Sequence, residues 1–244
     1  MQAYTRILAL FKREFTLMFN TALGYTFIVL FMFVESMIFF FGASGNSFWD
    51  RKSSDLGFFF TITPYLLLIL VPAMGMKIWA EEKEAGTWEI LFTLPFQDWE
   101  IILGKFFASA IYLIICLFST LLLPLTTLIF GNPDFGLILS GYMGVYLLGL
   151  TFLSIVIYVS IYVNSQIGAF IISFFVISVF YLFGLQKLID VIGENIFQFI
   201  SIFSIPKHFE SFYLGIIDIR DFYFFFSVNI LFLTFATFAL KGKR

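Results

Sequence analysis

The sequence FIVLFMFVESMIFFF, residues 27–41, is apolar on every side of any helix or strand that it could form. Its only charged residue is Glu35, and YLLLILVPAMGM at residues 65–76 has none. A membrane-spanning β-strand alternates apolar and polar residues, because one of its faces looks into the barrel. Uniformly apolar segments of this kind are instead typical of membrane-spanning α-helices.

The composition agrees with a membrane protein, because the 244 residues are 61% hydrophobic and 12% charged, whereas about 25% of residues in a soluble domain are charged. A helix needs about 20 apolar residues to cross the hydrocarbon core. Six runs qualify, at residues 22–42, 58–79, 100–130, 137–163, 168–186 and 222–240. We therefore expect an all-α, polytopic membrane protein with six transmembrane helices in one domain over residues 1–244. The long third run contains Pro124, which offers a site for a kink.

With six spans, both ends of the chain lie on the same side of the membrane. That side would hold nine Lys and Arg residues, and the other side would hold five. Positive residues near span ends favour the cytoplasm, so we expect both termini, and the loop between the second and third spans, to be cytoplasmic.

Residues 1–20 have an amphipathic pattern with a helical period. One face collects Tyr4, Ile7, Leu8, Phe11, Phe15 and Met18. The other face carries Arg6, Lys12 and Arg13. We expect an interfacial helix with these cations directed toward anionic lipid; the alternative is a plain cytoplasmic extension of the first span. A second amphipathic pattern, at residues 188–200, predicts a short helix at the outer interface.

Catalytic and ligand-binding motifs are missing from the sequence. The Gly-Lys pairs at residues 104–105 and 242–243 lack the other residues of a phosphate-binding P-loop. The only histidine, His208, and the only cysteine, Cys116, cannot form a metal cluster, and we expect His208 to be an ordinary surface residue. The net charge of −2 provides no basic field for nucleic acid. We expect no enzymatic activity, no bound cofactor and no nucleic-acid partner for this chain itself.

Glu35 is the one ionisable residue in the middle of a span. A charge there costs about 3 kcal/mol or more, so Glu35 should face the protein interior, water or a partner. Two interpretations stay open: a polar contact in a translocation pathway or subunit interface, and a protonated carboxyl group hydrogen-bonded within the bundle.

The loop after the second span, WAEEKEAGTWEILFTLP at residues 79–95, predicts two helices that meet at a corner. Gly86 can end the first helix with a positive φ, and Thr87 can cap the second. Glu89 then lies in the first turn, where the helix dipole favours an anion. Pro95 ends this short helix, and Asp98 can cap the following span, which has Glu100 in its first turn.

The short helix is apolar almost all round, which exceeds what one membrane-facing stripe requires. Its apolar residues are Trp88, Ile90, Leu91, Phe92 and Leu94. A protein partner with a matching groove would account for them; the alternative is a capped loop that lies at the membrane interface.

These residues also carry a resemblance to a known family. AEEKEAGTWEILFTLPFQDWEIILGKFF, residues 80–107, resembles the signature of type-2 ABC exporter permeases, in which this segment is the coupling helix. FKREF (11–15) with ALGYTFIVLFMF (22–33) is similar to the N-terminal helix and first span of that family. PKHFESFYLGIIDIRDFYFFFSVNILFL (206–233) resembles the branch of gliding-motility and nitrous-oxide-reductase-maturation permeases.

The resemblance implies a non-catalytic permease subunit in a bacterial cytoplasmic (inner) membrane. Its partners would be a second permease chain, as a homodimer or heterodimer, two ABC ATPase subunits that bind ATP and Mg²⁺, and a membrane-anchored extracytoplasmic accessory subunit. By position, contacts with the ATPase would involve Glu82, Lys83, Gly86, Thr87, Trp88, Glu89, Leu91 and Pro95. Trp88 and Leu91 would fill the partner's groove. The alternative is a membrane anchor that drives an extracytoplasmic partner without transporting a substrate.

Overall fold

The computed structural model describes residues 2–42, 47–51, 55–93, 95–182, 184 and 203–243, and every regular element in these residues is an α-helix. The all-α prediction is confirmed for this part of the chain. The N-terminal half holds α1 (Gln2–Asn20), α2 (Ala22–Phe41), α3 (Phe48–Arg51), α4 (Gly57–Gly75), α5 (Lys77–Glu84), α6 (Trp88–Thr93) and α7 (Asp98–Ser119). The remainder holds α8 (Leu122–Phe130), α9 (Phe135–Ser160), α10 (Gln166–Leu182), α13 (Ile205–Tyr213) and α14 (Ile219–Lys241).

Five helical segments are long and apolar enough to cross a membrane. They are Ala22–Phe41, Gly57–Glu84, Asp98–Phe130, Phe135–Ser160 and Ile219–Lys241. The remaining run that we expected to span, residues 168–186, corresponds to α10, whose 17 residues extend over about 26 Å. This is shorter than the hydrocarbon core of about 30 Å. The amphipathic segment expected at residues 188–200 lies outside the described residues.

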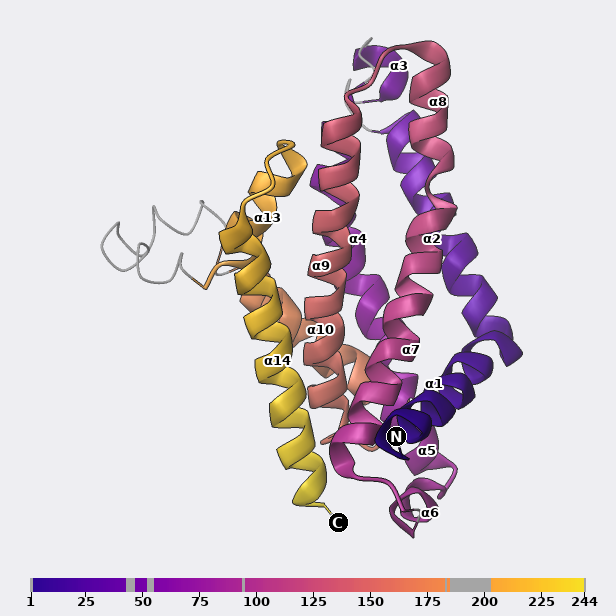
Figure 1. The fold of residues 1–244 in the computed structure, drawn as a ribbon. Coiled ribbons are helices and arrows are strands. Elements are labelled where there is room, and N and C mark those ends of the chain that lie inside the picture. The colour runs from indigo at the N-terminus through magenta and orange to yellow at the C-terminus, as the bar shows by residue number, and fades with distance from the viewer. Residues whose placement is uncertain are drawn as a thin grey trace.

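The long helices form a bundle in which the two chain ends lie together (Figure 1). The N-terminus, the C-terminus, α1, α5 and α6 all lie at one end of the bundle, whereas α3 and α8 lie at the other. The loop from α5 to α7 is therefore at the same end of the bundle as both termini.

Helix α9 lies at the centre of the bundle and packs against α4, α7, α10, α13 and α14. Small residues allow the close approach. A Cβ atom added at Gly144 would lie 2.4 Å from Cβ of Phe212, and one added at Gly149 would lie 2.5 Å from Cδ2 of Leu113. Small residues at helix contacts are typical of membrane bundles, because dispersion packing holds such helices together.

The third long segment is interrupted one turn before the proline that we expected to kink it. Helix α7 ends at Ser119 and α8 begins at Leu122, with Pro124 in its first turn. Proline has no N–H to donate to the carbonyl of Thr120, so the regular hydrogen bond to that oxygen is lost. The Leu123 N–H (2.9 Å) and the Tyr142 hydroxyl (3.2 Å) donate to that oxygen instead.

His208 on α13 is more than the ordinary surface residue that we expected. Its ring stacks on Phe224 of α14, with centroids 3.9 Å apart. Its Nδ1 lies 2.6 Å from Oδ1 of Asp221. The partner is thirteen residues away, so the sequence around His208 did not reveal it.

Candidate functional site

The corner between α5 and α6 is closed by backbone hydrogen bonds. Gly86 has φ of 69°, as predicted, and its N–H donates to the carbonyl of Lys83 over 3.2 Å. The N–H of Thr87 donates to the carbonyl of Glu82 over 2.9 Å, and the Thr87 hydroxyl donates to the same oxygen over 3.3 Å. These bonds form a Schellman motif, in which a left-handed glycine ends a helix. The direction in which α6 leaves α5 is thereby fixed.

Helix α6 has six residues and begins with Trp88 and the exposed Glu89. The ring of Trp88 is half-buried and contacts its own chain. It lies edge-to-face with Trp79 at 5.2 Å, and Nζ of Lys83 lies 4.9 Å above it. We expected this ring to project toward a partner, but aromatic and cation–π contacts within the chain hold it against α5. The Leu91 side chain lies outside the described part of the structure.

The next helix begins one residue earlier than we expected. Gln97, not Asp98, is the N-cap of α7, because Gln97 has the extended conformation (φ −83°, ψ 149°) and Asp98 is already helical. Glu100 is in the first turn, as predicted, and its Oε2 accepts a hydrogen bond from the Gln97 N–H over 2.9 Å. The same Glu100 oxygen lies 3.7 Å from Nη1 of Arg6 on α1.

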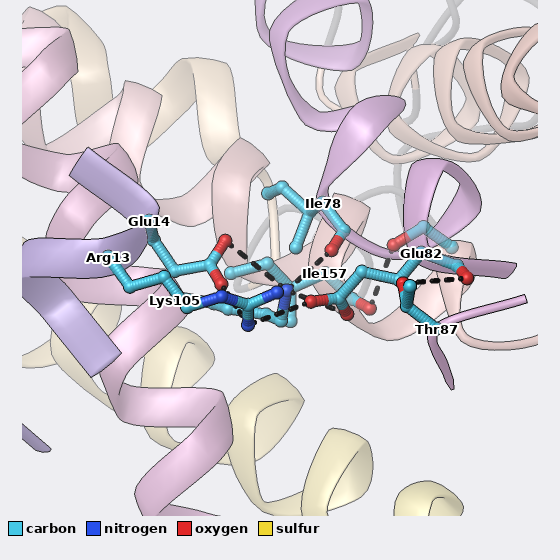
Figure 2. A network of polar contacts seen from close by, with 8 residues as sticks. Arg13, Glu14, Ile78, Glu82, Thr87, Lys105 and Ile157 are labelled. Atoms are coloured by element: carbon cyan, nitrogen blue, oxygen red, sulfur yellow. Dashed lines mark hydrogen bonds and ion pairs between the residues drawn. The ribbon is translucent and has the colours of Figure 1, made fainter. Parts of the chain in front are cut away.

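A buried lysine, Lys105 on α7, lies at the centre of a charge cluster that joins three helices (Figure 2). Only 1% of it is exposed. Its Nζ lies 3.3 Å from Oε2 of Glu14 on α1 and 3.1 Å from Oε2 of Glu82 on α5. It donates to the carbonyl of Ile78 over 2.8 Å and lies 4.6 Å above the ring of Trp79. These contacts surround the ammonium group on several sides.

Arg13 completes the cluster from the side of α1 (Figure 2). Its Nη1 lies 3.2 Å from Oε1 of Glu14 and 3.1 Å from Oε1 of Glu82. Two cations and two carboxylates therefore alternate, so their formal charges cancel. Removing one member of a buried ion pair costs about 3–5 kcal/mol, because a buried charge is left without a partner. The cluster therefore holds α1, α5 and α7 in one arrangement.

These contacts add partners within the chain that we did not expect for the cations of α1. Arg6 and Arg13, which we expected to be directed toward lipid headgroups, are 35% and 44% exposed and also pair with acids of the chain, Glu100 and Glu82. Those pairs are available because α1 packs closely on α7, where Gly104 lies against Leu10. Lys12 is exposed, as an interfacial role requires.

Helix α5 is also joined to the turn between α9 and α10. Nζ of Lys83 donates to the carbonyls of Ile161 (2.6 Å) and Val163 (2.8 Å), which follow α9. The carboxylate of Glu84 accepts hydrogen bonds from the backbone N–H (3.0 Å) and side-chain amide (2.8 Å) of Gln166. Lys83 thus contacts its own chain, although the sequence led us to assign it to contacts with a partner.

Glu35 faces the interior of the bundle, which was one of the alternatives for it. Only 1% of it is exposed, and its carboxyl group interacts with Thr63 of α4. The Oε1 atom has no hydrogen-bond partner among the described residues. Glu35 lies away from the charge cluster, which is formed by α1, α5 and α7.

Comparison with known proteins identifies the family. The family model described as ABC-2 family transporter protein matches residues 8–240. The chain belongs to this family. As an ABC-2 transporter protein with several apolar helices, it is a multi-pass membrane protein, and membership implies ATPase partner subunits in general. No curated protein sequence matches the chain. Among the described residues of this ABC-2 protein, no three His, Cys, Asp or Glu residues form a metal-binding group.

Proposed function

We propose that the chain is the permease subunit of an ABC transporter, in which α6 is a cytoplasmic coupling helix that docks into a separate ATPase subunit. The family membership and the position of α6 support this. Helix α6 follows a sharp corner after α5, at the end of the bundle where α1 also lies (Figure 1). It begins with an exposed acid, Glu89, and its sequence contains more apolar residues than one stripe needs.

The observation that carries the proposal is the set of charged contacts behind α6. Helix α5 is bound to α1 and α7 through Glu82 and to the α9–α10 turn through Lys83 and Glu84. A displacement of α6 would therefore move several long helices together, because buried ion pairs resist separation. A surface loop without a partner would not require such contacts.

The predicted coupling residues then divide into two groups. Glu82, Lys83 and Trp88 contact the permease itself and hold the corner. Gly86, Thr87, Glu89 and Pro95 are exposed and are available to the ATPase. In this arrangement the first group transmits force and the second group receives it.

The proposed assembly contains two permease chains and two ATPase subunits, and the ATPases bind ATP and Mg²⁺. Helix α10 and the residues after it would complete a sixth span, so both termini would lie in the cytoplasm of a cell with this chain in its inner membrane. Exposed aromatic residues on α2, such as Phe33 (59% exposed) and Phe41 (74%), are available to lipid or to the second permease. A membrane-anchored accessory subunit would bind on the outer side.

Two kinds of output are compatible with ATP-driven movement of these helices. One is export of a substrate between the two permeases. The other is mechanical work on an extracytoplasmic partner, as the resemblance to gliding-motility permeases suggests. The enclosure of Glu35 against α4 favours the mechanical alternative, because this carboxyl group contacts Thr63 of its own bundle. ATP turnover without movement of any lipid cargo in vesicles would support the mechanical role.

The docking proposal is tested by co-purification of the tagged chain with a P-loop ATPase from its own membranes. Leu91→Asp introduces a charge on α6, and burying that charge in the ATPase groove would be unfavourable. We expect this variant to lose the ATPase. A control, Leu214→Asp, makes the same change at a position that is 56% exposed near the other end of the bundle. Retention of the ATPase by Leu91→Asp would refute the docking assignment.

A further inference from the structure

A cavity of about 210 Å³ lies between α1, α2, α5 and α7, beside the charge cluster. It is lined on one side by Leu17 and Leu23, which are 47% and 42% exposed, so it opens toward the surface where α1 turns into α2. The turn is at Thr21, which has an extended conformation (φ −106°, ψ 140°). The cavity therefore lies where an interfacial helix meets the first membrane span.

The polarity of the cavity wall changes along the direction of α7. This helix begins at the end of the bundle near α6 and runs toward the opposite end (Figure 1). Lys105, Ser109 and Tyr112 follow one another along the wall, and at 1.5 Å per residue they lie at successive depths over about 10 Å. Their order is a charged group, a hydroxyl group and an aromatic ring.

The innermost part of the cavity is apolar and continues into the bundle. Phe27, Met74 and Tyr112 line both this cavity and an adjoining apolar crevice of about 20 Å³. Farther in, the crevice is lined by Phe31 and Leu113, together with other apolar residues of α4 and α7. Hydrocarbon is the chemistry that fits this part, because it has no hydrogen bonds to lose.

Two charged residues at the polar end of the cavity do not belong to the charge cluster. Three cations and three acids line the cavity, and four of these six form the cluster. The other two, Lys77 and Glu81, lie one turn apart on α5 and take part in none of the ion pairs found among the described residues. A ligand with one phosphate and one ammonium group would match them.

Ser109 provides a second, independent indication of a ligand. It is fully buried, and its hydroxyl has no hydrogen-bond partner among the described residues. A buried hydroxyl without a partner is unfavourable. It lies on α7 about 6 Å beyond Lys105, between the charged and the apolar parts of the wall, so a ligand with carbonyl oxygens between a charged head and hydrocarbon would match it.

The geometry points to a binding site for one zwitterionic glycerophospholipid of the surrounding bilayer. Lys77 and Glu81 bind its phosphate and its ammonium group, the Ser109 hydroxyl donates to an ester carbonyl, and an acyl chain follows Phe27 and Met74. The bound lipid contacts Glu82 and Thr87, which form the corner before α6. The headgroup composition of the membrane therefore influences the position of α6. Lipid binding itself needs no ATPase, so its test can fail or succeed independently of the test of the docking proposal.

The test is native mass spectrometry of the full-length chain in mild detergent, with added phosphatidylethanolamine or phosphatidylglycerol as probes. Lys77→Glu places an acid beside the phosphate and should weaken retention of phosphatidylethanolamine by about tenfold or more, because a charge-assisted contact is lost. Ser109→Ala should weaken it by about fivefold, the effect of one neutral hydrogen bond. Leu23→Trp fills the opening from an exposed position and should remove the bound lipid.

Lys12→Glu is the matched control, because it makes the same charge change on an exposed part of α1 that does not line the cavity. Retention of one phosphatidylethanolamine by the wild type and by this control, with loss in the Lys77 and Leu23 variants, supports the site. Equal retention in all variants overturns it, as does equal loss in the control. Equal retention of phosphatidylglycerol by the wild type overturns the zwitterionic assignment.

Discussion

Replacement of Lys105 by methionine tests whether the charge cluster holds the permease together. Methionine has a similar length and keeps much of the packing against Trp79. It removes, however, the ammonium group that lies 3.3 Å from Glu14 and 3.1 Å from Glu82. Two buried carboxylates would then repel each other with only Arg13 between them.

The expected cost follows from burial. Lys105 is 1% exposed, and the side chains of Glu14 and Glu82 are 10% and 11% exposed. Loss of one partner from a buried pair costs about 3–5 kcal/mol. For a chain of 244 residues, each kcal/mol lowers the melting temperature by about 2–4 °C. Lys105→Met should therefore lower the melting temperature in detergent by at least about 6 °C.

The assay is thermal unfolding of the purified chain, with Lys12→Met as the exposed control. Glu82→Gln removes one of the two charges that Lys105 leaves behind, so the double variant should recover part of the loss. The coupling energy from this double-mutant cycle should be about 1–3 kcal/mol. A melting temperature for Lys105→Met within 1 °C of the control, or a double variant whose losses simply add, would refute the role of the cluster.

Three further substitutions test other parts of the account. An alanine in Gly86→Ala would meet no steric clash, but it would have to adopt the φ of 69° that Gly86 has. That conformation should destabilise the corner by about 1 kcal/mol and increase its rate of proteolysis. An unchanged cleavage rate would contradict the glycine's role. Gly144→Leu should destabilise the bundle by about 1–3 kcal/mol, since Phe212 occupies the space that the leucine would need. The control in a melting assay is Gly242→Leu, where a Cβ would have its nearest contact at 3.7 Å. Equal shifts in melting temperature for the two variants would argue against the close packing. Glu35→Gln keeps a hydrogen-bonding group and replaces the buried carboxyl with an amide that cannot ionise, so we expect an unchanged or higher melting temperature. A loss of several degrees would show that the carboxyl group itself is required.

The sequence was most informative where one segment determines its own structure. Apolar runs predicted the long helices, and Gly86 predicted the corner, because a positive φ is a local property of glycine. The fifth run, residues 168–186, predicted the bounds of its helix less well. Hydropathy counts apolar residues, but it does not determine where a helix begins, and α10 (Gln166–Leu182) begins two residues before that run.

The candidate site was harder to predict, since its contacts join residues far apart in the chain. Periodicity placed Arg13 on a polar face but could not show that Glu82 would be its partner. Glu14 and Lys105 were not recognised as site residues at all. A usable signal was present: Lys105 lies seven residues into an apolar helix, and a charge in such a place needs a partner. Identifying that partner required the packing of α1 on α7.

Site-specific photo-crosslinking from α6 tests the central claim most directly. A photoreactive residue in place of the exposed Glu89 should crosslink to the ATPase subunit in native membranes. The same residue in place of Asp134, which is exposed before α9 at the far end of the bundle, should not. A crosslink from position 89 and none from position 134 is the result that we predict. An intact complex with no crosslink from position 89 would contradict α6 as the coupling helix.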